Sequence, residues 1–266
     1  MWMTYFEALS LILIMGIVTW VYSLVRRDVS IVDSLWSLMF LAAAMYFVWK
    51  NPEMNLRSWL VFVLVAVWAL RLSIHLTVRN WGEPEDRRYQ EIRRNNEPYF
   101  GVKSLSIIFG LQGLLAWIIS IPLLFALTVK TSFHWLDWFA VTLWLVGFTF
   151  EAVSDFQLLR FKRNQGGNGG VLDSGLWRYT RHPNYFGEFC IWWSFFLLAM
   201  PAGGWWTVYA PLLMSFLLLK VSGVVLMEKG ISTRRPEYQA YIDRTNAFFP
   251  GRQKQDVNLV MEEQQS

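Results

Sequence analysis

The sequence is poor in the residues that bind metals or form disulfides, with one cysteine and three histidines among 266 residues. Cys190 cannot form an intramolecular disulfide, and its apolar neighbours in the sequence predict a buried, unreactive thiol. His75, His134 and His182 are widely separated, and neither a CxxC nor an HExxH motif occurs. We therefore expect no disulfide framework and no metal site.

Two further absences concern nucleotide and nucleic-acid binding. No GxGxxG motif follows a strand pattern, so a Rossmann domain is not expected to hold any nucleotide. The formal net charge is +4, but no basic stripe is interleaved with solvent-facing aromatic residues, as a nucleic-acid surface requires. We expect no nucleic acid among the partners, and the excess of positive charge is better explained by membrane topology.

Long apolar runs dominate the chain. Hydrophobic residues make up 55% of the sequence and charged residues 17%, which is too apolar for an ordinary soluble domain. The sequence predicts an all-α, polytopic membrane protein with about seven spans, because seven stretches approach the ~20 residues that a spanning helix needs. These stretches are residues 5–25, 31–49, 58–78, 105–129, 135–155, 185–200 and 205–226. The sixth is expected to be tilted or only partly spanning, since Pro201 and the glycines after it end it early.

Basic residues are divided unevenly between the two sets of loops. One set, with the tail, holds most of them: Arg26, Arg27, Arg79, Arg87, Arg88, Arg93, Arg94, Lys103, Arg160, Lys162, Arg163, Arg178, Arg181, Lys229, Arg234, Arg235, Arg244, Arg252 and Lys254. The other set has only Lys50, Arg57 and Lys130. The positive-inside rule then predicts an outer amino terminus and a cytoplasmic carboxyl terminus. We expect an integral, multi-pass protein, in the inner or cell membrane if it is bacterial, with its active site facing the cytoplasm.

Residues 175–188, GLWRYTRHPNYFGE, concentrate charged and polar side chains at the start of the sixth apolar stretch. The glycine-rich run 166–170 precedes them, and Arg160, Lys162 and Arg163 precede that run. Because charge at a bilayer surface usually serves a ligand and arginine pairs well with phosphate, this pattern predicts a site for a phosphate-bearing cofactor. An alternative is that the basic residues only anchor the chain to lipid headgroups.

Acidic residues also occur within the apolar stretches. Glu188 lies about one turn inside the sixth stretch, where an unpaired acid costs several kcal/mol. Glu151 and Asp155 are four residues apart in the fifth stretch and share one helix face. These positions predict an inward-facing, polar cavity.

Residues 151–162 and 175–188, with Glu228, Arg235, Tyr238 and Tyr241 of the tail, resemble the carboxyl-terminal half of the steroid 5-alpha-reductase and sterol reductase superfamily. The similarity extends from about residue 28 to residue 250, and it is greatest with an uncharacterised, mostly bacterial branch of that superfamily. Isoprenylcysteine carboxyl methyltransferases, which use S-adenosylmethionine, share the Arg-His-Pro-x-Tyr core. The motif is therefore specific for the superfamily and less specific for the cofactor.

The resemblance implies NADPH as the cofactor. Asn184 and Glu188 match the reductase residues that hold the nicotinamide, and Asp155 matches the acid before the basic loop. Arginines and lysines there suit phosphate groups, which S-adenosylmethionine lacks. The implied cofactor-binding residues are Asp155, Arg160, Lys162, Arg163, Arg178, Tyr179, Arg181, His182, Asn184, Tyr185, Glu188, Glu228, Arg235, Tyr238 and Tyr241.

The catalytic residues implied by the resemblance lie in the amino-terminal half. His75 and Arg79 repeat the His…Arg spacing of the family's third-span motif, but Leu76 stands where the family has tyrosine. Tyr89 is then the candidate for the missing hydroxyl, and Asp33 for the carboxylate that helps to hold a ketone. Simpler roles remain open: a helix-start residue for Asp33, a polar pair in the bundle for His75 and an interfacial aromatic for Tyr89.

Three hypotheses about function follow. The first is an NADPH-dependent reductase of a carbon–carbon double bond in a lipophilic, steroid-like or isoprenoid enone. In it, residues 1–104 form the substrate side, residues 105–251 bind the cofactor and residues 252–266 are a polar tail. The second is an S-adenosylmethionine-dependent methyltransferase acting on a lipid-soluble acceptor. The third is a non-enzymatic, lipid-binding membrane protein. The expected partners are a lipophilic small molecule and the lipid bilayer.

Overall fold

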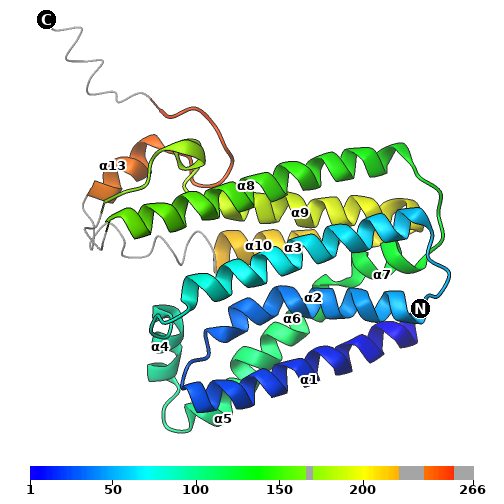
Figure 1. Ribbon diagram of the computed structural model, residues 1–266, viewed down its shortest axis with the longest axis horizontal. Helices are drawn as coiled ribbons and strands as arrows, with labels where there is room; N and C mark the ends of the chain where they lie inside the picture. The colour runs from blue at the N-terminus through cyan, green and yellow to red at the C-terminus, as the bar shows by residue number, and fades with distance from the viewer. Residues whose placement is uncertain (166–169, 222–236, 255–266) are drawn as a thin grey trace, which may run out of the picture. The chain divides into compact units, whose positions relative to one another are not determined.

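The structure, a computed structural model, describes residues 1–165, 170–221 and 237–254. Every regular element in these ranges is helical, which confirms the predicted all-α class (Figure 1). The elements are α1 (Trp2–Arg26), α2 (Ile31–Lys50), α3 (Leu56–Asn80), α4 (Arg87–Asn95), α5 (Phe100–Ser104), η1 (Leu105–Gly110), α6 (Leu111–Ile119), α7 (Ile121–Thr128), α8 (Trp135–Gln165), η2 (Gly175–Arg178), α9 (Pro183–Ala199), η3 (Met200–Ala202), η4 (Trp205–Val208), α10 (Tyr209–Phe216), η5 (Leu217–Val221) and α13 (Glu237–Arg244).

Within the described ranges, six helical stretches are long and apolar enough to cross a membrane. They are Trp2–Arg26, Ile31–Lys50, Leu56–Asn80, Phe100–Ile119, Trp135–Asn164 and Pro183–Ala202. Helices suit this setting because lipid offers no hydrogen-bond partners, so each backbone group must be paired inside its own segment. The chain is thus a multi-pass membrane protein. The rest of the predicted seventh span, beyond the helical stretch Trp205–Val221, lies outside the described residues. The count of seven spans and the orientation of the termini stay predictions.

The fourth predicted span differs from the sequence expectation. Residues 105–129 were expected to form one helix, but the helix stops at Ser120 and α7 begins at Ile121. Pro122, in the first turn of α7, has no N–H and cannot continue the helix above it. The α5–α6 span also contains a π-helical segment, η1, between α5 and α6. The spanning helix is therefore Phe100–Ile119, and α7 is a separate, buried helix.

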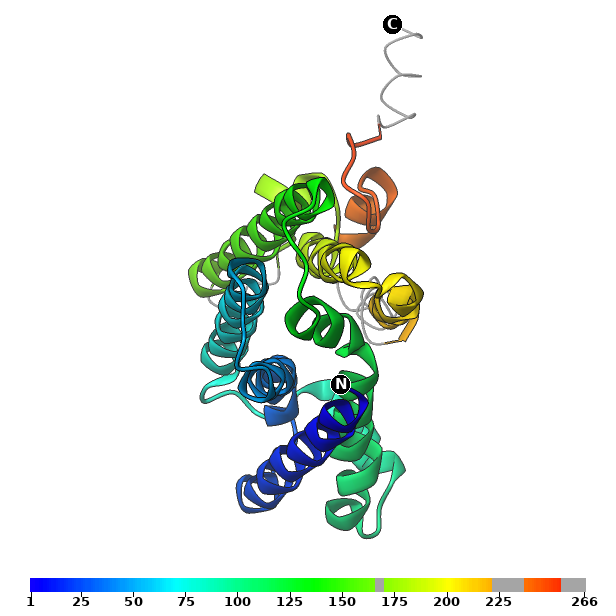
Figure 2. The same ribbon diagram turned by 90° about the vertical axis from the view of Figure 1, so that its right-hand side faces the viewer.

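The chain forms two compact units. Unit 1 comprises Met1–Ala140 and Phe195–Ala210. In it α1, α2 and α3 lie side by side, and α6 and α7 pack against them (Figures 1 and 2). Its core contains the fully buried rings of Phe40, Phe47 and Trp68. The outer face of α1 exposes large apolar side chains, as a lipid-facing surface does.

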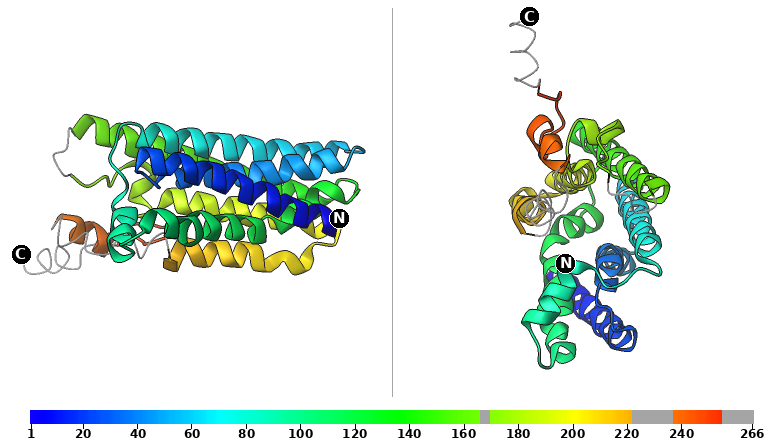
Figure 3. Two further views of the ribbon diagram at one scale, coloured as in Figure 1. Left: turned by 90° about the horizontal axis from the view of Figure 1, so that it is seen from below. Right: turned by 90° about the vertical axis from the view of Figure 1, so that its left-hand side faces the viewer.

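Unit 2 comprises Val141–Ser194 and Pro211–Ser266. Its helices α8 and α9 run side by side, and α13 lies beside the η2 segment near the carboxyl end of α8 (Figures 1 and 3). Gly147 and Gly187 face each other where α8 and α9 meet, because a Cβ atom added to either would lie 2.5–2.6 Å from the other's carbonyl oxygen. Small residues allow membrane helices to approach this closely. The functional division at residue 104 stays a prediction.

Candidate functional site

The segment 175–188 is attached to α8 through its first turn. Gly175 has φ +62°, and a Cβ atom at this position would collide with the side chain of Gln157. Gln157 Oε1 accepts a hydrogen bond of 3.1 Å from the Leu176 N–H. Trp177 donates its indole N–H to the Ser154 carbonyl at 3.1 Å. The glycine and tryptophan of the motif therefore fix the segment on α8.

The carboxyl-terminal segment closes over the same motif. Tyr241 of α13 donates its hydroxyl to the Trp177 carbonyl at 2.5 Å. The Thr180 hydroxyl donates to the Phe248 carbonyl at 2.8 Å, and the Gly251 N–H donates to the Tyr179 carbonyl at 3.0 Å. Residues about 60–70 positions apart in the sequence are thereby held together. We call residues 237–254, which make these contacts, the carboxyl-terminal strap.

Arg181 belongs to the same contact network. Its Nη1 donates to the carbonyls of Ile242 at 3.0 Å and Thr245 at 2.5 Å, and its backbone N–H donates to the Asn246 carbonyl at 2.9 Å. The side chain is buried, with 8% of the residue exposed. Arg181 thus binds the strap from the motif, and Tyr241 holds the strap to the Trp177 carbonyl. Their predicted roles as cofactor ligands stay predictions. Burial, with the neighbouring Tyr238, raises the pKa of Tyr241, so its hydroxyl remains a donor at neutral pH.

Replacing Tyr241 with phenylalanine tests the strap. The change leaves the buried Trp177 carbonyl without this donor, and we expect the free energy of unfolding to fall by about 1–3 kcal/mol. Tyr179→Phe is the matched control, because this tyrosine belongs to the same motif but is 47% exposed. The melting temperatures of the two variants are compared by thermal unfolding in detergent. Equal melting temperatures for both variants would show that the strap contact adds no stability.

Buried polar groups follow along α8 and α9. Asn184 donates from Nδ2 to Asp155 Oδ1 at 3.2 Å. Glu188 accepts a 3.0 Å hydrogen bond from the Trp192 indole at Oε1. Asp155 and Glu188 are only 5% and 6% exposed. The structure therefore brings the predicted acid of α8 to the amide of α9, and it keeps the glutamate inside the protein.

His182 and Tyr185 complete the start of α9. Their rings stack at 5.5 Å with an interplanar angle of 3°. His182 is buried and Tyr185 is half-buried. Tyr185 also donates its backbone N–H to Asn184 Oδ1 at 3.0 Å. These contacts orient the amide of Asn184, whose Nδ2 donates to Asp155.

The predicted phosphate ligands are more exposed. Three basic residues on the last turns of α8 and two residues of the motif have exposed side chains: Arg160, Lys162, Arg163, Arg178 and Tyr179. Tyr238 is half-buried and packs edge-to-face on Tyr241 at 5.3 Å. Glu228 and Arg235 lie outside the described residues. Unit 2 thus combines a basic, accessible end of α8 with a buried polar start of α9.

The structure brings Asp33 and Tyr89 together in unit 1. The Tyr89 hydroxyl donates to Asp33 Oδ1 at 2.5 Å, and Arg88 donates from Nη2 to Asp33 Oδ2 at 2.8 Å. Burial, followed by the charge of Asp33, raises the pKa of Tyr89 well above its ordinary value. Arg88 also binds both carboxylate oxygens of Asp86. Burial opposes ionisation of Asp86, but the hydrogen bonds from Arg88 outweigh it and lower the Asp86 pKa.

Neighbouring contacts fasten α4 to the connection between α1 and α2. Glu85 accepts the Val29 N–H at 3.0 Å and forms a two-point ion pair with Arg93 at 2.7 and 2.9 Å. The Asp86 N–H donates to the Ser30 hydroxyl at 2.8 Å. The charged residues at the start of α4 are therefore structural partners of the α1–α2 turn. His75 is half-buried on α3. Its catalytic role stays a prediction.

One polar centre was missed by sequence reasoning, which treated Arg57 only as an outer-face charge. Arg57 of α3 forms a two-point ion pair with Asp137 of α8, with Nε–Oδ2 and Nη2–Oδ1 distances of 2.9 and 2.8 Å. Both side chains are 1% exposed. The sequence did contain a pattern that indicates such a pair: an acid in the first turn of one apolar helix and an arginine in the first turn of another.

Comparisons with known proteins name no activity. A family model described as "Protein of unknown function (DUF1295)" matches residues 19–245. The chain is also similar to "Uncharacterized protein C594.04c" of Schizosaccharomyces pombe, with 26% identity over 272 residues, covering 91% of this chain and 78% of that protein. No solved structure matches.

Proposed function

The chain belongs to this family of unknown function, DUF1295, and from its own residues we propose that it is a membrane-embedded, NADPH-dependent reductase. The proposed substrate is a lipophilic enone, steroid-like or isoprenoid, whose carbon–carbon double bond is reduced. One observation carries the proposal. In unit 2 an amide and a buried carboxylate, Asn184 and Glu188, lie one turn apart at the start of a spanning helix, and exposed cations end the neighbouring helix.

The chemistry of these residues fits a phosphorylated dinucleotide. Arg160, Lys162 and Arg163 are exposed on the last turns of α8, so phosphate groups can reach them from water. Asn184 and Glu188 offer amide and carboxylate groups of the kind that pair with a carboxamide. Asp155 holds Asn184 in place through the 3.2 Å hydrogen bond. These residues would hold the nicotinamide end, and the cations of α8 would hold the phosphates.

NADPH, when bound, would supply a hydride to the β-carbon of the enone, and a proton from water would complete the α-carbon. The protein must then provide a hydrogen-bond donor for the carbonyl oxygen, where negative charge develops. Tyr89 keeps its proton at neutral pH, because burial and Asp33 raise its pKa. A carbonyl oxygen within reach would compete with Asp33 Oδ1 for this proton, and Arg88 would still compensate the charge of Asp33 through Oδ2. We therefore assign Tyr89 as the proposed donor and Asp33 as the group that positions it.

Cofactor binding separates this proposal from its alternatives. We expect NADPH to stabilise the detergent-purified protein by about 2.7 kcal/mol at 100 times Kd. Glu188→Gln is expected to weaken that binding about 10- to 150-fold, because a hydrogen bond to a charged acceptor contributes about 1.5–3 kcal/mol. The variant can still accept the Trp192 indole N–H, so its fold is preserved. Asp243→Asn, at an exposed acid of α13, is the matched control.

The same thermal-shift measurement is made with NADH and with S-adenosylmethionine. If S-adenosylmethionine stabilised the protein and NADPH did not, the reductase hypothesis would be rejected in favour of the methyltransferase hypothesis. The Arg-His-Pro-x-Tyr core of this chain resembles that of such methyltransferases. No response to any cofactor would favour a lipid-binding protein without enzymatic activity. Unchanged NADPH affinity in Glu188→Gln would remove Glu188 from the proposed site.

A further inference from the structure

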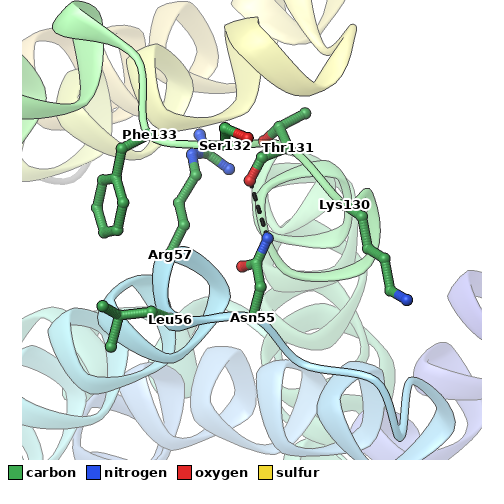
Figure 4. Close-up of a pocket in the computed structure, with 7 residues that line it drawn as sticks. All are labelled: Asn55, Leu56, Arg57, Lys130, Thr131, Ser132 and Phe133. Carbon is green, nitrogen blue, oxygen red and sulfur yellow. Dashed lines mark hydrogen bonds between the residues drawn. The ribbon is translucent and has the colours of Figure 1, made fainter.

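A shallow hollow lies in unit 1, where α3 begins and residues 130–133 lead into α8 (Figure 4). Its volume is about 410 Å³, within the range of about 300–1,000 Å³ that small-molecule sites occupy. None of the predicted cofactor or catalytic residues lines it, and the start of α3 is roughly 27 Å along the helix from His75. We propose that this hollow binds the phosphate group of a membrane phospholipid.

The base of the hollow is held in a fixed shape. Asn55 donates from Nδ2 to the Thr131 carbonyl at 2.8 Å and accepts the Ser58 N–H at 2.8 Å (Figure 4). Arg57 reaches toward residues 131–133, and its charge is neutralised by Asp137. The segment that precedes α8 is therefore tied to the first turn of α3 before any ligand binds.

A hydroxyl in this base has unused hydrogen-bonding capacity. The Thr131 Oγ1 atom is buried and has no hydrogen-bond partner among the described residues. Buried polar atoms in native proteins are nearly always paired, so an unpaired one points to a missing partner. The hydroxyl can donate to a phosphate oxygen once the ligand displaces the atoms that cover it.

Two features attract an anion to this place. Lys130 at the edge of the hollow pairs only with Glu53 among the described residues, and the two side chains are 58% and 74% exposed. Such a surface pair contributes little, and the lysine can exchange its partner for a phosphate. The first turn of α3 adds unpaired N–H groups and the positive end of the helix dipole, with no acidic residue there to oppose them.

The opposite edge of the hollow favours a lipid over free phosphate. Leu56 and Phe133 lie at that edge (Figure 4) and are 76% and 41% exposed. Phe133 stacks on the exposed Trp138 at 5.8 Å, as aromatic residues do at a membrane interface. A cation at one edge and an apolar rim at the other match a phosphate that carries acyl chains. By the predicted topology, the hollow lies at the non-cytoplasmic leaflet of the membrane.

Thermal shift with short-chain lipids tests the proposal. Dioctanoyl phosphatidylglycerol should raise the melting temperature, whereas inorganic phosphate and dioctanoylglycerol, which lacks the phosphate, should not. Lys130→Gln is expected to raise the Kd for the phospholipid about tenfold through loss of the charged hydrogen bond. Glu53→Gln is expected to lower the Kd, because it removes the competing carboxylate.

Lys50→Gln is the matched control, since Lys50 is another lysine in a partly exposed ion pair, with Glu7. It should leave lipid binding unchanged. Equal affinity in wild type and Lys130→Gln would overturn the proposal, as would equal stabilisation by dioctanoylglycerol. A full response to inorganic phosphate alone would overturn the assignment to lipid, because it would show an anion site that does not select acyl chains. Melting temperatures without lipid verify that each variant is folded.

Discussion

Replacing Asp137 with asparagine is expected to lower the free energy of unfolding by about 3–5 kcal/mol, the usual effect of breaking a buried ion pair. Arg57 and Asp137 are both 1% exposed. Asparagine has nearly the same shape as aspartate, so packing is kept and only the counter-charge is lost. The guanidinium of Arg57 would then stay buried without an anion, which accounts for the size of the effect.

The position of the pair in unit 1 increases its importance. Besides Asp137, Arg57 donates to the carbonyls of Leu198 and Ala126. Asp137 also accepts the His134 N–H at 2.8 Å. The pair therefore connects the start of α3, the end of α7, the start of α8 and the end of α9. Losing it loosens four segments at once.

A double variant and a surface variant complete the experiment. Arg57→Met with Asp137→Leu removes both charges, and we expect it to recover most of the loss, because apolar residues can replace a buried pair. Glu53→Gln breaks the exposed pair with Lys130 and should leave the lipid-free melting temperature unchanged. If the double variant were as unstable as Asp137→Asn, the loss would come from packing and not from an uncompensated charge.

The fold was largely predictable because lipid restricts the choices. A run of apolar residues long enough to cross the bilayer must be helical. Each of the six spanning stretches overlaps a predicted one, and the fourth is displaced toward the amino terminus, to Phe100–Ile119. The break at Ser120 follows from Pro122, a signal present in the sequence but not used. Sequence alone did not reveal how the helices meet, because contact between Gly147 and Gly187 depends on the rotation of two helices about their axes.

The sequence named the residues of the candidate site but not the contacts between them. Asp33 and Tyr89 were both candidates, and their hydrogen bond joins residues 56 positions apart in the sequence. Arg181 was expected to face a ligand, yet it binds backbone carbonyls of the carboxyl-terminal strap. Residue types in a motif indicate which chemistry is present. Contacts with residues that are distant in the sequence decide which side chains face a ligand and which only hold the motif in place.

Gly187→Ala is the second change with a large expected effect. The new Cβ atom would lie 2.5 Å from the Gly147 carbonyl oxygen and 2.6 Å from the Glu151 backbone nitrogen. Neither neighbour is a flexible side chain, so α8 and α9 must move apart. We expect the free energy of unfolding to fall by about 3 kcal/mol, at the upper end of the effects of overpacking. This loss exceeds the gain of about 1 kcal/mol in helix propensity.

Gly16→Ala is the control variant. It separates the steric clash expected at Gly187 from the general effect of replacing a glycine in a helix with alanine. Gly16 is also buried in a spanning helix, but a Cβ atom there would meet its nearest neighbour, the Phe109 carbonyl oxygen, at 3.7 Å. This is ordinary contact, so the change should leave the melting temperature unchanged or raise it slightly. Gly147→Ala should behave like Gly187→Ala, because its Cβ atom would lie 2.6 Å from the Gly187 carbonyl oxygen. Equal melting temperatures for Gly16→Ala and Gly187→Ala would contradict the close approach of α8 and α9. Gly187 would then be present in the motif for a reason other than helix packing.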